Sequence, residues 1–499
     1  MVWARVGVLA TLLATACAAI QEYTFTVSEA TITPDDYARP GALIVNGQYP
    51  GPKIEVNTGD IVRVTVNNNL TTQCPIPAGG SYTYEFSTEG QSGTYWWHSH
   101  YMSQYVDGIL GPLIIHNATA ESQVLPYDEE LVISLSDWYH TPAPSLVTHY
   151  LSRSSKGEEP TPDNALINGK MNNGCKLYVP PGTSCNPNAT LSEFTFVPGK
   201  KYRLRLINTS AFANFHFSID NHTLTVIEAD GTDIKPLTVD RIPINVAQRY
   251  SVVVKANQKP QGYYMRAQID IPCAAGGDVG KPAVSLATAL VNYQGGANTF
   301  NGSVNKKDHL IDCQDLDYKV LRPYYAQNPP SHPSQLVTLN FGFQLDPNTA
   351  IKYAYINNQT YMANFTNPTL LNIWSNQLQL SGDQYIININ NAQWVDLLLT
   401  NNDASEHPFS FPRPHILRFG NPLRRDTSTI PPTGWTYLRF LTDNPGVWAL
   451  HCHIQGQMEA GLSVQIVENP AAIRRLPIPA DNLALCSYPY KQVTKRHHP

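Results

Sequence analysis

The sequence predicts an all-β protein made of several sandwich- or barrel-type domains. Short stretches in which apolar and polar residues alternate recur along the chain, for example at residues 61–66, 201–207 and 247–254. A period of two is typical of strands that bury one face, and the Gly-, Pro- and Asn-rich intervals between the stretches suit sandwiches and barrels. The low content of charged residues, 15%, and the many aromatic residues argue against coiled coils, helical bundles and disorder.

The chain is long enough for several domains, since 499 residues suffice for two to four packed cores. From usual domain sizes we expect three domains, at residues 20–120, 121–300 and 320–470, followed by a C-terminal tail at 471–499. We expect a monomer. The formal net charge of −5 comes without a basic stripe that would hold phosphate groups, so a nucleic-acid partner is not expected.

Residues 1–19 predict a signal peptide. Arg5 precedes an apolar run from Val6 to Ala16, and small residues at 16–18 fit a cleavage site. The run is shorter than the roughly 18 apolar residues of a membrane span, and no later stretch reaches that length. We therefore expect a secreted, soluble protein without a membrane partner. Eight Asn-x-Ser/Thr acceptors suggest a glycoprotein: Asn69, Asn117, Asn188, Asn208, Asn221, Asn301, Asn358 and Asn364.

The cysteine count indicates one thiol with a special role. Removal of the signal peptide also removes Cys17 and leaves seven cysteines. In an oxidising compartment an odd number means that one cysteine is not in an internal disulfide, and we assign that role to Cys452. The other six could form three disulfides in any of about 15 connectivities: Cys74, Cys175, Cys185, Cys273, Cys313 and Cys486.

Two short motifs carry residues that bind metals. His98 and His100 are two positions apart, so on a strand both imidazoles point to one face and can converge on a metal ion. In the run of residues 451–453, His451 and His453 would face one way and Cys452 the other. The thiolate could then bind a soft copper ion while the two imidazoles hold metals on the opposite face. Electrons that enter at the sulfur would reach the second site through a short covalent path.

With their surroundings, these motifs resemble the multicopper oxidases, especially fungal laccase-like enzymes, over nearly the whole mature chain. The resemblance implies three cupredoxin domains of Greek-key sandwich or barrel type. It also implies four copper ions per chain. A mononuclear blue copper in the third domain would take electrons from a phenolic reductant, and a trinuclear cluster between the first and third domains would reduce dioxygen to water. The likeness is carried by residues 44–52, 97–101, 107–112, 160–168, 228–232, 423–426, 443–448 and 451–454.

Carried over by position, the resemblance implies two sets of ligands and several losses. Cys452 and His407 would bind the mononuclear copper, and Leu462 would stand at its non-coordinating axial position. The expected cluster ligands are His98, His100, His451 and His453. Gln457 occupies the position of the second mononuclear histidine, while Ser410 and Pro412 stand where two cluster histidines belong.

The remaining losses lie in the first domain. The first His-x-His pair of the family should follow residues 64–70, but the chain passes directly to residues 71–77, so we expect the first domain to lack a strand. Five of the ten expected histidines are missing. Met458 or water could replace one mononuclear donor. Four missing cluster ligands predict fewer copper ions and no ordinary four-electron reduction of oxygen. We expect no substitute from His415, which is out of register.

Several functions remain open from the sequence. The first is a laccase-like oxidase of phenols or aromatic amines, and the second a ferroxidase-type relative, because Glu159 resembles the acidic position of iron-oxidising members. A single acidic residue in a loop is, however, ordinarily solvated. The third is a secreted, copper-poor and catalytically silent glycoprotein on a cupredoxin scaffold. The losses are local while flanking motifs are kept, which favours truncation or mis-splicing of an active enzyme as their origin. A domain that lacks a strand exposes an edge and part of its core, so we expect reduced stability.

Overall fold

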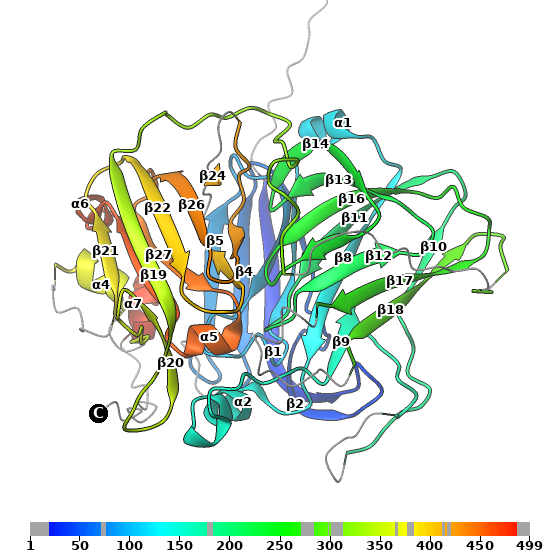
Figure 1. Cartoon of the computed structure of the whole chain (residues 1–499), viewed down its shortest axis with the longest axis horizontal. Helices are drawn as coiled ribbons and strands as arrows, with labels where there is room; N and C mark the ends of the chain where they lie inside the picture. Colours follow the sequence, from blue (N-terminus) through cyan, green and yellow to red (C-terminus); the bar gives the residue numbers. More distant parts are fainter. Residues whose placement is uncertain are drawn as a thin grey trace, which may run out of the picture.

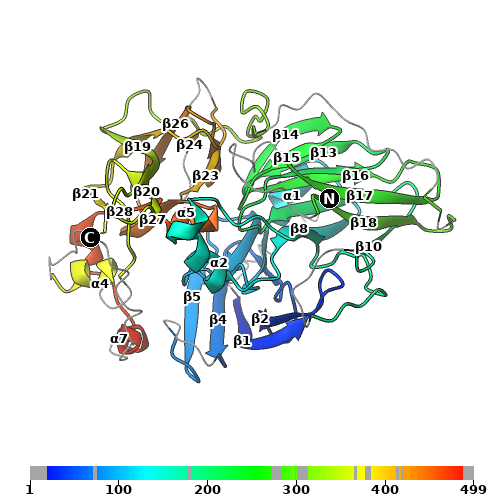
Figure 2. The same cartoon turned by 60° about the horizontal axis from the view of Figure 1, so that its bottom comes forward.

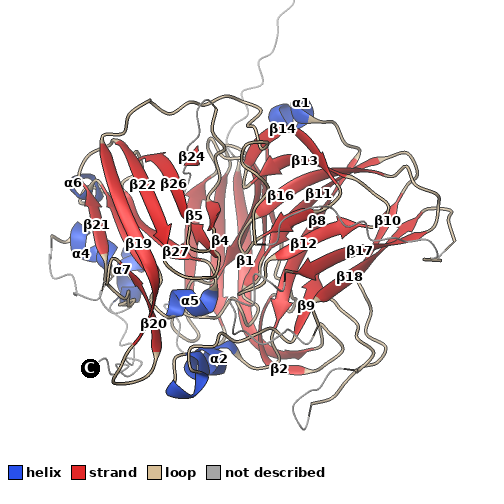
Figure 3. Ribbon diagram, viewed as in Figure 1, coloured by secondary structure: helices blue, strands red, loops and turns tan. Residues whose placement is uncertain are grey.

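The regular secondary structure of the computed structural model consists almost entirely of strands, with a few short helices (Figure 3). Within the described residues, no helix is long and apolar enough to cross a membrane. Residues 1–18, which hold nearly all of the expected signal peptide, lie outside the described part. The structure describes residues 19–70, 76–176, 183–270, 284–297, 299–300, 313–364, 368–376, 384–411, 415–416 and 421–486.

The N-terminal strands form the first two-sheet unit. One sheet has the order β2-β1-β4-β5 and the other β3-β7-β6, and a core that includes Phe25, Val27, Val62, Val64 and Ile115 fills the space between them. The strands are β1 (Ile20–Ile32), β2 (Arg39–Val45), β3 (Ile54–Asn57), β4 (Ile61–Asn68), β5 (Ser81–Ser87), β6 (Gly93–His98) and β7 (Leu110–His116).

The middle of the chain forms the second unit, with a six-stranded sheet of order β14-β13-β16-β11-β8-β9 and a five-stranded sheet of order β10-β18-β17-β12-β15. Helices α1 (Ala118–Val124) and α2 (Ala143–Tyr150) and the short 3-10 helix η1 (Arg153–Ser155) lie in its connections. The strands are β8 (Glu129–Trp138), β9 (Asn164–Ile167), β10 (Glu193–Phe196), β11 (Lys201–Asn208), β12 (Phe215–Ile219), β13 (Leu224–Ala229), β14 (Thr232–Val239), β15 (Ile242–Ile244), β16 (Arg249–Lys255), β17 (Gly262–Ile269) and β18 (Leu286–Tyr293).

The third unit has two five-stranded sheets, of orders β20-β19-β22-β26-β24 and β21-β28-β27-β23-β25. Its helices are α4 (Thr369–Trp374), α5 (Gln455–Glu459), α6 (Pro470–Ile473) and α7 (Ala480–Cys486). The strands are β19 (Gln335–Leu345), β20 (Lys352–Ile356), β21 (Ile386–Ile389), β22 (Trp394–Asn401), β23 (His407–Ser410), β24 (His415–Ile416), β25 (Thr427–Ile430), β26 (Trp435–Leu441), β27 (Gly446–Cys452) and β28 (Ser463–Glu468).

The predicted all-β architecture of three sandwich units is therefore confirmed (Figure 1). The residue boundaries expected for the three domains stay predictions. In Figure 2 the units form a triangle, with the first unit at the bottom and helices α2 and α5 near the junction. The second and third units share one continuous apolar core, whereas the first has a core of its own.

Buried charged residues of the second unit bind β6 of the first unit through hydrogen bonds. Glu228 accepts hydrogen bonds from the Thr94 backbone N–H at 2.7 Å and from Arg203 Nη2 at 2.6 Å. Arg205 donates to the Thr94 hydroxyl at 3.1 Å. All four residues are buried, and ionised groups keep their charge inside a protein only when they are paired in this way. The network fixes the strand that carries His98.

Two ion pairs join the second unit to the third. Arg249 donates to both carboxylate oxygens of Asp426, at 2.6 and 2.7 Å, and its Nε donates to the Thr94 carbonyl at 2.9 Å. Arg425 Nε donates to Asp230 at 2.8 Å, and both partners are fully buried at the side chain. Residues 228–232 and 423–426, which carry part of the family resemblance, thus hold the three units together.

The first unit leaves part of its inner face uncovered at β5. Val62 is paired with Phe86 and Val64 with Tyr84 across β4 and β5, and residues directly opposite each other point to the same face of a sheet. Val62 and Val64 are buried, yet Tyr84 is 49% exposed and Phe86 37%. An apolar face that is covered over β4 but open over β5 is what the loss of a covering strand predicts.

Candidate metal centre

Four histidines from two sandwich units meet at one point of the structure. His98 ends β6 and His100 follows it, while His451 lies near the end of β27 and His453 follows that strand. The Nε2 atoms of His100 and His451 are 3.2 Å apart. The ring centroids of His98 and His453 are 5.3 Å apart. The spacing of two residues therefore brings these side chains together as two pairs, one histidine of each pair coming from the first unit and one from the third.

The environment of this four-histidine group favours neutral imidazoles. Burial, reinforced by the neighbouring His100, lowers the pKa of His98 to about 4, and burial likewise lowers that of His451 to about 3. His98 Nδ1 and His451 Nδ1 each lie within 2.9 Å of a backbone carbonyl, which leaves their Nε2 atoms for another partner. Neutral imidazole is the metal-binding form of histidine.

A further observation fits a metal here. His453 Nδ1 is buried and has no hydrogen-bond partner among the described residues. Buried polar atoms normally have a partner, so an unpaired one needs an explanation. A group of uncharged imidazoles suits copper, which binds imidazole well.

The losses expected at this group have a structural counterpart. Ser410 in β23 is directly opposite His451 in the ladder between β23 and β27. Its hydroxyl lies 3.0 Å from that of Thr427, so a hydroxyl pair occupies the position where the resemblance implies an imidazole. Pro412 and residues 71–75 lie outside the described residues. The structure thus shows four imidazoles together and no histidine at position 410.

The backbone of His415 does not lie beside the four-histidine group. Its strand β24 pairs with β26, in the opposite sheet from β23 and β27. The side chain of His415 lies outside the described part of the structure. The expectation that it gives no substitute ligand stays a prediction.

A second set of donor atoms lies on the other face of β27. The Cys452 thiol is fully buried and free of any disulfide, as the cysteine count predicted. Its Sγ lies 3.9 Å from His407 Nδ1, and His407 Nε2 faces Asp403 Oδ2 at 3.2 Å, which orients the ring. With ligand bonds of roughly 2.0 to 2.3 Å, a sulfur and a nitrogen on one metal are roughly 3.6 to 3.8 Å apart. Cys452 and His407 therefore fit two ligands of one ion.

Gln457 places a polar atom between these two donors. Its Oε1 accepts from Cys452 Sγ at 3.1 Å and lies 2.6 Å from His407 Nδ1. Burial raises the pKa of the Cys452 thiol well above its ordinary value, so without a metal the thiol is protonated and donates. The count of histidines in the sequence treats Gln457 only as a lost imidazole and misses its carboxamide oxygen. Gln457 therefore presents a donor atom to the site, and a role of Met458 stays a prediction.

Apolar side chains pack against this site. Leu462, at the expected axial position, is fully buried, and its carbonyl accepts from the Cys452 N–H at 3.1 Å. The rings of Phe341 and Phe343 have centroids 5.2 and 5.8 Å from that of His407. Such packing excludes water from the donor atoms and restricts their movement.

Glu159 extends the site on its outer side. Gln457 Nε2 donates to Glu159 Oε2 at 3.0 Å, and Glu159 Oε1 is buried without a hydrogen-bond partner among the described residues. Burial raises the pKa of this carboxyl to about 7. The expectation that Glu159 is an ordinary solvated loop residue is therefore wrong, because its loop packs against α5. A cavity of about 40 Å³ adjoins it, lined among others by Tyr139, Leu146, Val147, Tyr150, Phe212 and Ile454.

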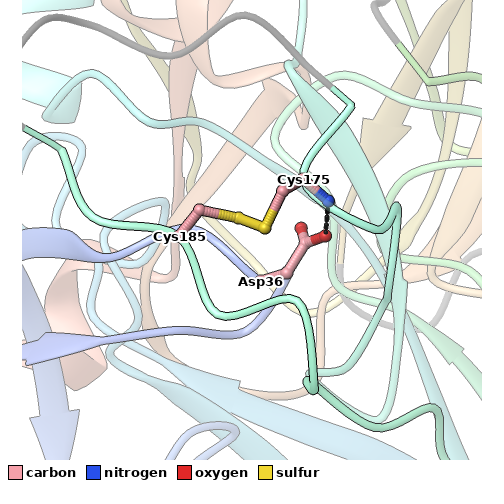
Figure 4. A group of neighbouring side chains, drawn as sticks. All are labelled: Asp36, Cys175 and Cys185. Carbon is pink, nitrogen blue, oxygen red and sulfur yellow. Dashed lines mark hydrogen bonds between the residues drawn. A yellow bond between two sulfur atoms is a disulfide. The ribbon is translucent and has the colours of Figure 1, made fainter.

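Asp36, Cys175 and Cys185 also lie close together, and residues of these types often bind metals, but here they have a structural role. Cys175 and Cys185 form a disulfide, and Asp36 Oδ2 accepts from the Cys175 backbone N–H at 2.8 Å (Figure 4). Both sulfurs are used in the bond, so no thiolate remains for a metal. Cys313 is also disulfide-bonded. Cys74 and Cys273 lie outside the described residues.

The chain is similar to known multicopper oxidases. Multicopper oxidase profiles match residues 26–73 and 70–120, 129–296 and 412–472, and the first match is split where the first His-x-His pair should stand. Laccase-4 of Thanatephorus cucumeris is 33% identical over 94% of this chain and 93% of its own length. Laccase-2 of Cryptococcus neoformans var. grubii is 30% identical over 94% and 87%.

Solved structures of the family superpose closely. The laccase of Botrytis aclada has a TM-score of 0.84 at 30% identity, with 95% of this chain and 92% of that chain covered. Fet3p, described as a multicopper oxidase that functions in iron import, has a TM-score of 0.81 at 27% identity, with 94% of each chain covered. Family membership implies a copper cofactor, and the donor atoms described above are those that copper prefers. The chain belongs to the multicopper oxidase family and is similar to fungal laccases.

Proposed function

We propose that this protein is a laccase-type copper oxidoreductase that accepts single electrons from phenolic or related aromatic reductants but is impaired in the reduction of dioxygen to water. The observation that carries the proposal is the position of Cys452. Its sulfur contacts His407 and Gln457 on one face of β27, while the flanking His451 and His453 join the four-histidine group on the other. Copper at the first site supplies one-electron chemistry, and the backbone around Cys452 connects the two sites through covalent bonds.

Glu159 and its cavity support an aromatic reductant. Most residues that line the cavity are apolar or aromatic, and Glu159, whose Oε1 has no hydrogen-bond partner among the described residues, adds a carboxylate to the lining. A phenol is larger than this cavity of about 40 Å³, so its ring would lie partly outside, against the apolar wall, while its hydroxyl group donates to the carboxylate. Oxidation of a phenol by one electron releases one proton, which Glu159 can accept at the same place.

The four-histidine group supports impaired oxygen reduction. Complete reduction uses four electrons and four protons per dioxygen and gives two waters, and the family uses eight cluster histidines for it. Four are present together, and Ser410 with its hydroxyl partner Thr427 replaces one of the others. We therefore infer fewer than four copper ions per chain.

Oxidation of ferrous iron is a second candidate, because Glu159 contacts a residue of the metal site directly. Iron is the substrate in this alternative. It would bind to the Glu159 carboxylate, whose Oε2 accepts a hydrogen bond from Gln457 Nε2 at 3.0 Å. The likeness to Fet3p supports it. A catalytically silent scaffold is the outcome if neither reductant delivers electrons.

Anaerobic mixing of the copper-loaded protein with a phenol or with ferrous iron tests these functions. Thiolate–copper charge transfer gives a visible band that reports on copper bound by Cys452. We expect the phenol to bleach the band and air to restore it slowly, with oxygen uptake far below that of the Botrytis aclada laccase. Bleaching by ferrous iron alone would favour the iron-oxidising alternative. A band that neither reductant bleaches would mean a silent scaffold, and oxygen uptake equal to that of the laccase would contradict the impairment.

We also propose that the protein is secreted and glycosylated, as the signal-peptide expectation and the acceptor sites suggest. Asn208 is an exception among the acceptors. It is fully buried, and its Nδ2 donates to the carbonyls of Ala213 and Ile244, so a glycan there is incompatible with this fold. Mass spectrometry of the secreted protein should find a new N-terminus near residue 20 and glycans at sites other than Asn208.

A further inference from the structure

We propose that Gln457 is itself a metal ligand, so that Cys452, His407 and the Gln457 carboxamide oxygen bind one copper ion through sulfur, nitrogen and oxygen. The inference rests on the proposed function only in that copper is taken as the metal. It changes the composition of the site, because the family position of Gln457 holds a second imidazole. The chain has therefore exchanged a nitrogen donor for an oxygen donor.

The contacts of Oε1 support this role. It is the hydrogen-bond partner of both Cys452 Sγ and His407 Nδ1, at 3.1 and 2.6 Å. Three atoms that can all donate electron pairs thus surround one point, and the hydrogen that Cys452 Sγ donates to Oε1 lies between two of them. A metal ion that enters there displaces this hydrogen, as is usual when thiol and imidazole groups bind a metal.

The orientation of the carboxamide is fixed from outside the site. Gln457 Nε2 donates to Glu159 Oε2 at 3.0 Å, so the amide nitrogen must face outward and the oxygen inward. Gln457 is also buried and lies in α5, directly after the Cys452 strand and its His453–Ile454 extension. Glu159 is therefore a positioning residue for the oxygen donor and not a ligand.

The donor set is chemically suited to copper. Thiolate and imidazole are established copper ligands, and a glutamine oxygen serves as a weak ligand at some blue-copper sites. An oxygen in place of an imidazole should give weaker binding and a changed thiolate–copper spectrum, while Leu462 leaves the axial side without a donor.

Copper titration of the whole secreted chain and its variants tests the role of Gln457, with the visible band specific for Cys452-bound copper as the readout. We expect Gln457→Leu, which removes the oxygen but keeps similar volume, to weaken copper binding at this site by about tenfold or more. Gln457→His should strengthen binding and move the spectrum, and Glu159→Leu should weaken it, whereas Glu159→Gln, which keeps an acceptor, should restore it. Equal affinity and spectrum in Gln457→Leu and the unaltered protein would overturn the proposal.

A measurement on the unaltered protein covers the case in which a variant does not fold. Pulsed electron paramagnetic resonance of the Cys452-bound copper should detect one coordinated imidazole, that of His407. Two coordinated imidazoles would overturn the proposal. If one imidazole is found but no reductant bleaches the visible band, Gln457 stays a ligand and the proposed oxidoreductase function fails instead.

Discussion

The Nε2 atoms of His100 and His451 lie 3.2 Å apart, although 351 positions separate the two residues in the sequence. One belongs to the first sandwich unit and the other to the third, so the four-histidine group exists only while the units stay docked. The docking itself depends on buried charges around Thr94, which lies four residues before His98 in β6. Stability and metal binding are therefore linked in this protein.

Removal of Asp426 should loosen the docking. Asp426→Ala leaves Arg249, which is 3% exposed, without its bidentate partner. We expect a loss of about 3 kcal/mol in the free energy of unfolding, because a buried charge that loses its bidentate partner is costly and Arg249 would keep only Asp230, at 3.5 Å, as an acidic partner among the described residues. We also expect weaker copper binding at the four-histidine group. Glu85→Ala, which breaks the exposed pair with Arg63, is the matched control and should cost far less, because exposed ion pairs contribute little to stability. Similar losses from both substitutions, measured by denaturant unfolding, would argue against this role of Asp426.

Acid should weaken the contact between the first and second units through Glu228. Burial alone would raise its pKa, but Arg203 and Arg205 lower it to about 2 from an ordinary 4.5. Because the folded-state pKa is depressed, the contribution is present above pH 4.5 and is lost as the pH falls towards 2. Its size is about 2 to 4 kcal/mol. The free energy of unfolding, measured between pH 6 and pH 3 on the unaltered protein and on Glu228→Gln, should fall less steeply in the variant, and parallel curves would contradict the assignment.

Insertion of the missing segment should cover the exposed face of β5. Insertion of a laccase strand that carries the first His-x-His pair between Leu70 and Thr71 would cover Tyr84 and Phe86, now 49% and 37% exposed. Burial of such side chains stabilises by about 2 kcal/mol each, so the melting temperature should rise and aggregation should decrease. An equal melting temperature in both versions would mean that the first unit does not need this strand for its stability. Sequencing of the transcript across codons 65–80 and 405–420 separates mis-splicing from a true loss.

The cavity beside Glu159 should determine how tightly the reductant binds and how fast it is oxidised. Leu146→Phe fills part of the apolar wall without contact to Cys452, so we expect a higher KM for phenols and an unchanged visible band. Glu159→Gln removes the proton acceptor but keeps a partner for Gln457 Nε2, and it should lower the rate of bleaching more than it changes copper affinity. A reductant KM that does not respond to Leu146→Phe would place the reductant elsewhere.

The sequence predicted the all-β fold of three sandwich units, and it predicted that His98 and His100 lie beside His451 and His453; the binding of copper by these residues stays a prediction. The alternation of apolar and polar residues, and the spacing of His98 with His100 and of His451 with His453, depend only on neighbouring residues of one strand. They can therefore be recognised in the sequence. The role of Gln457 was not predictable in this way, because only the tertiary contacts of its carboxamide with Cys452 and Glu159 reveal it. The burial of Glu159 and the pairing of Arg249 with Asp426 likewise depend on the packing of one unit against another.

Copper per chain in the purified secreted protein, measured by elemental analysis together with the visible band of Cys452-bound copper, tests the central claim most directly. We predict fewer than four copper ions, one of them bound by Cys452, because four of the expected histidines of the cluster are missing while Cys452, His407 and Gln457 remain together. Four copper ions per chain would contradict this claim, and so would copper-loaded protein without the thiolate–copper band.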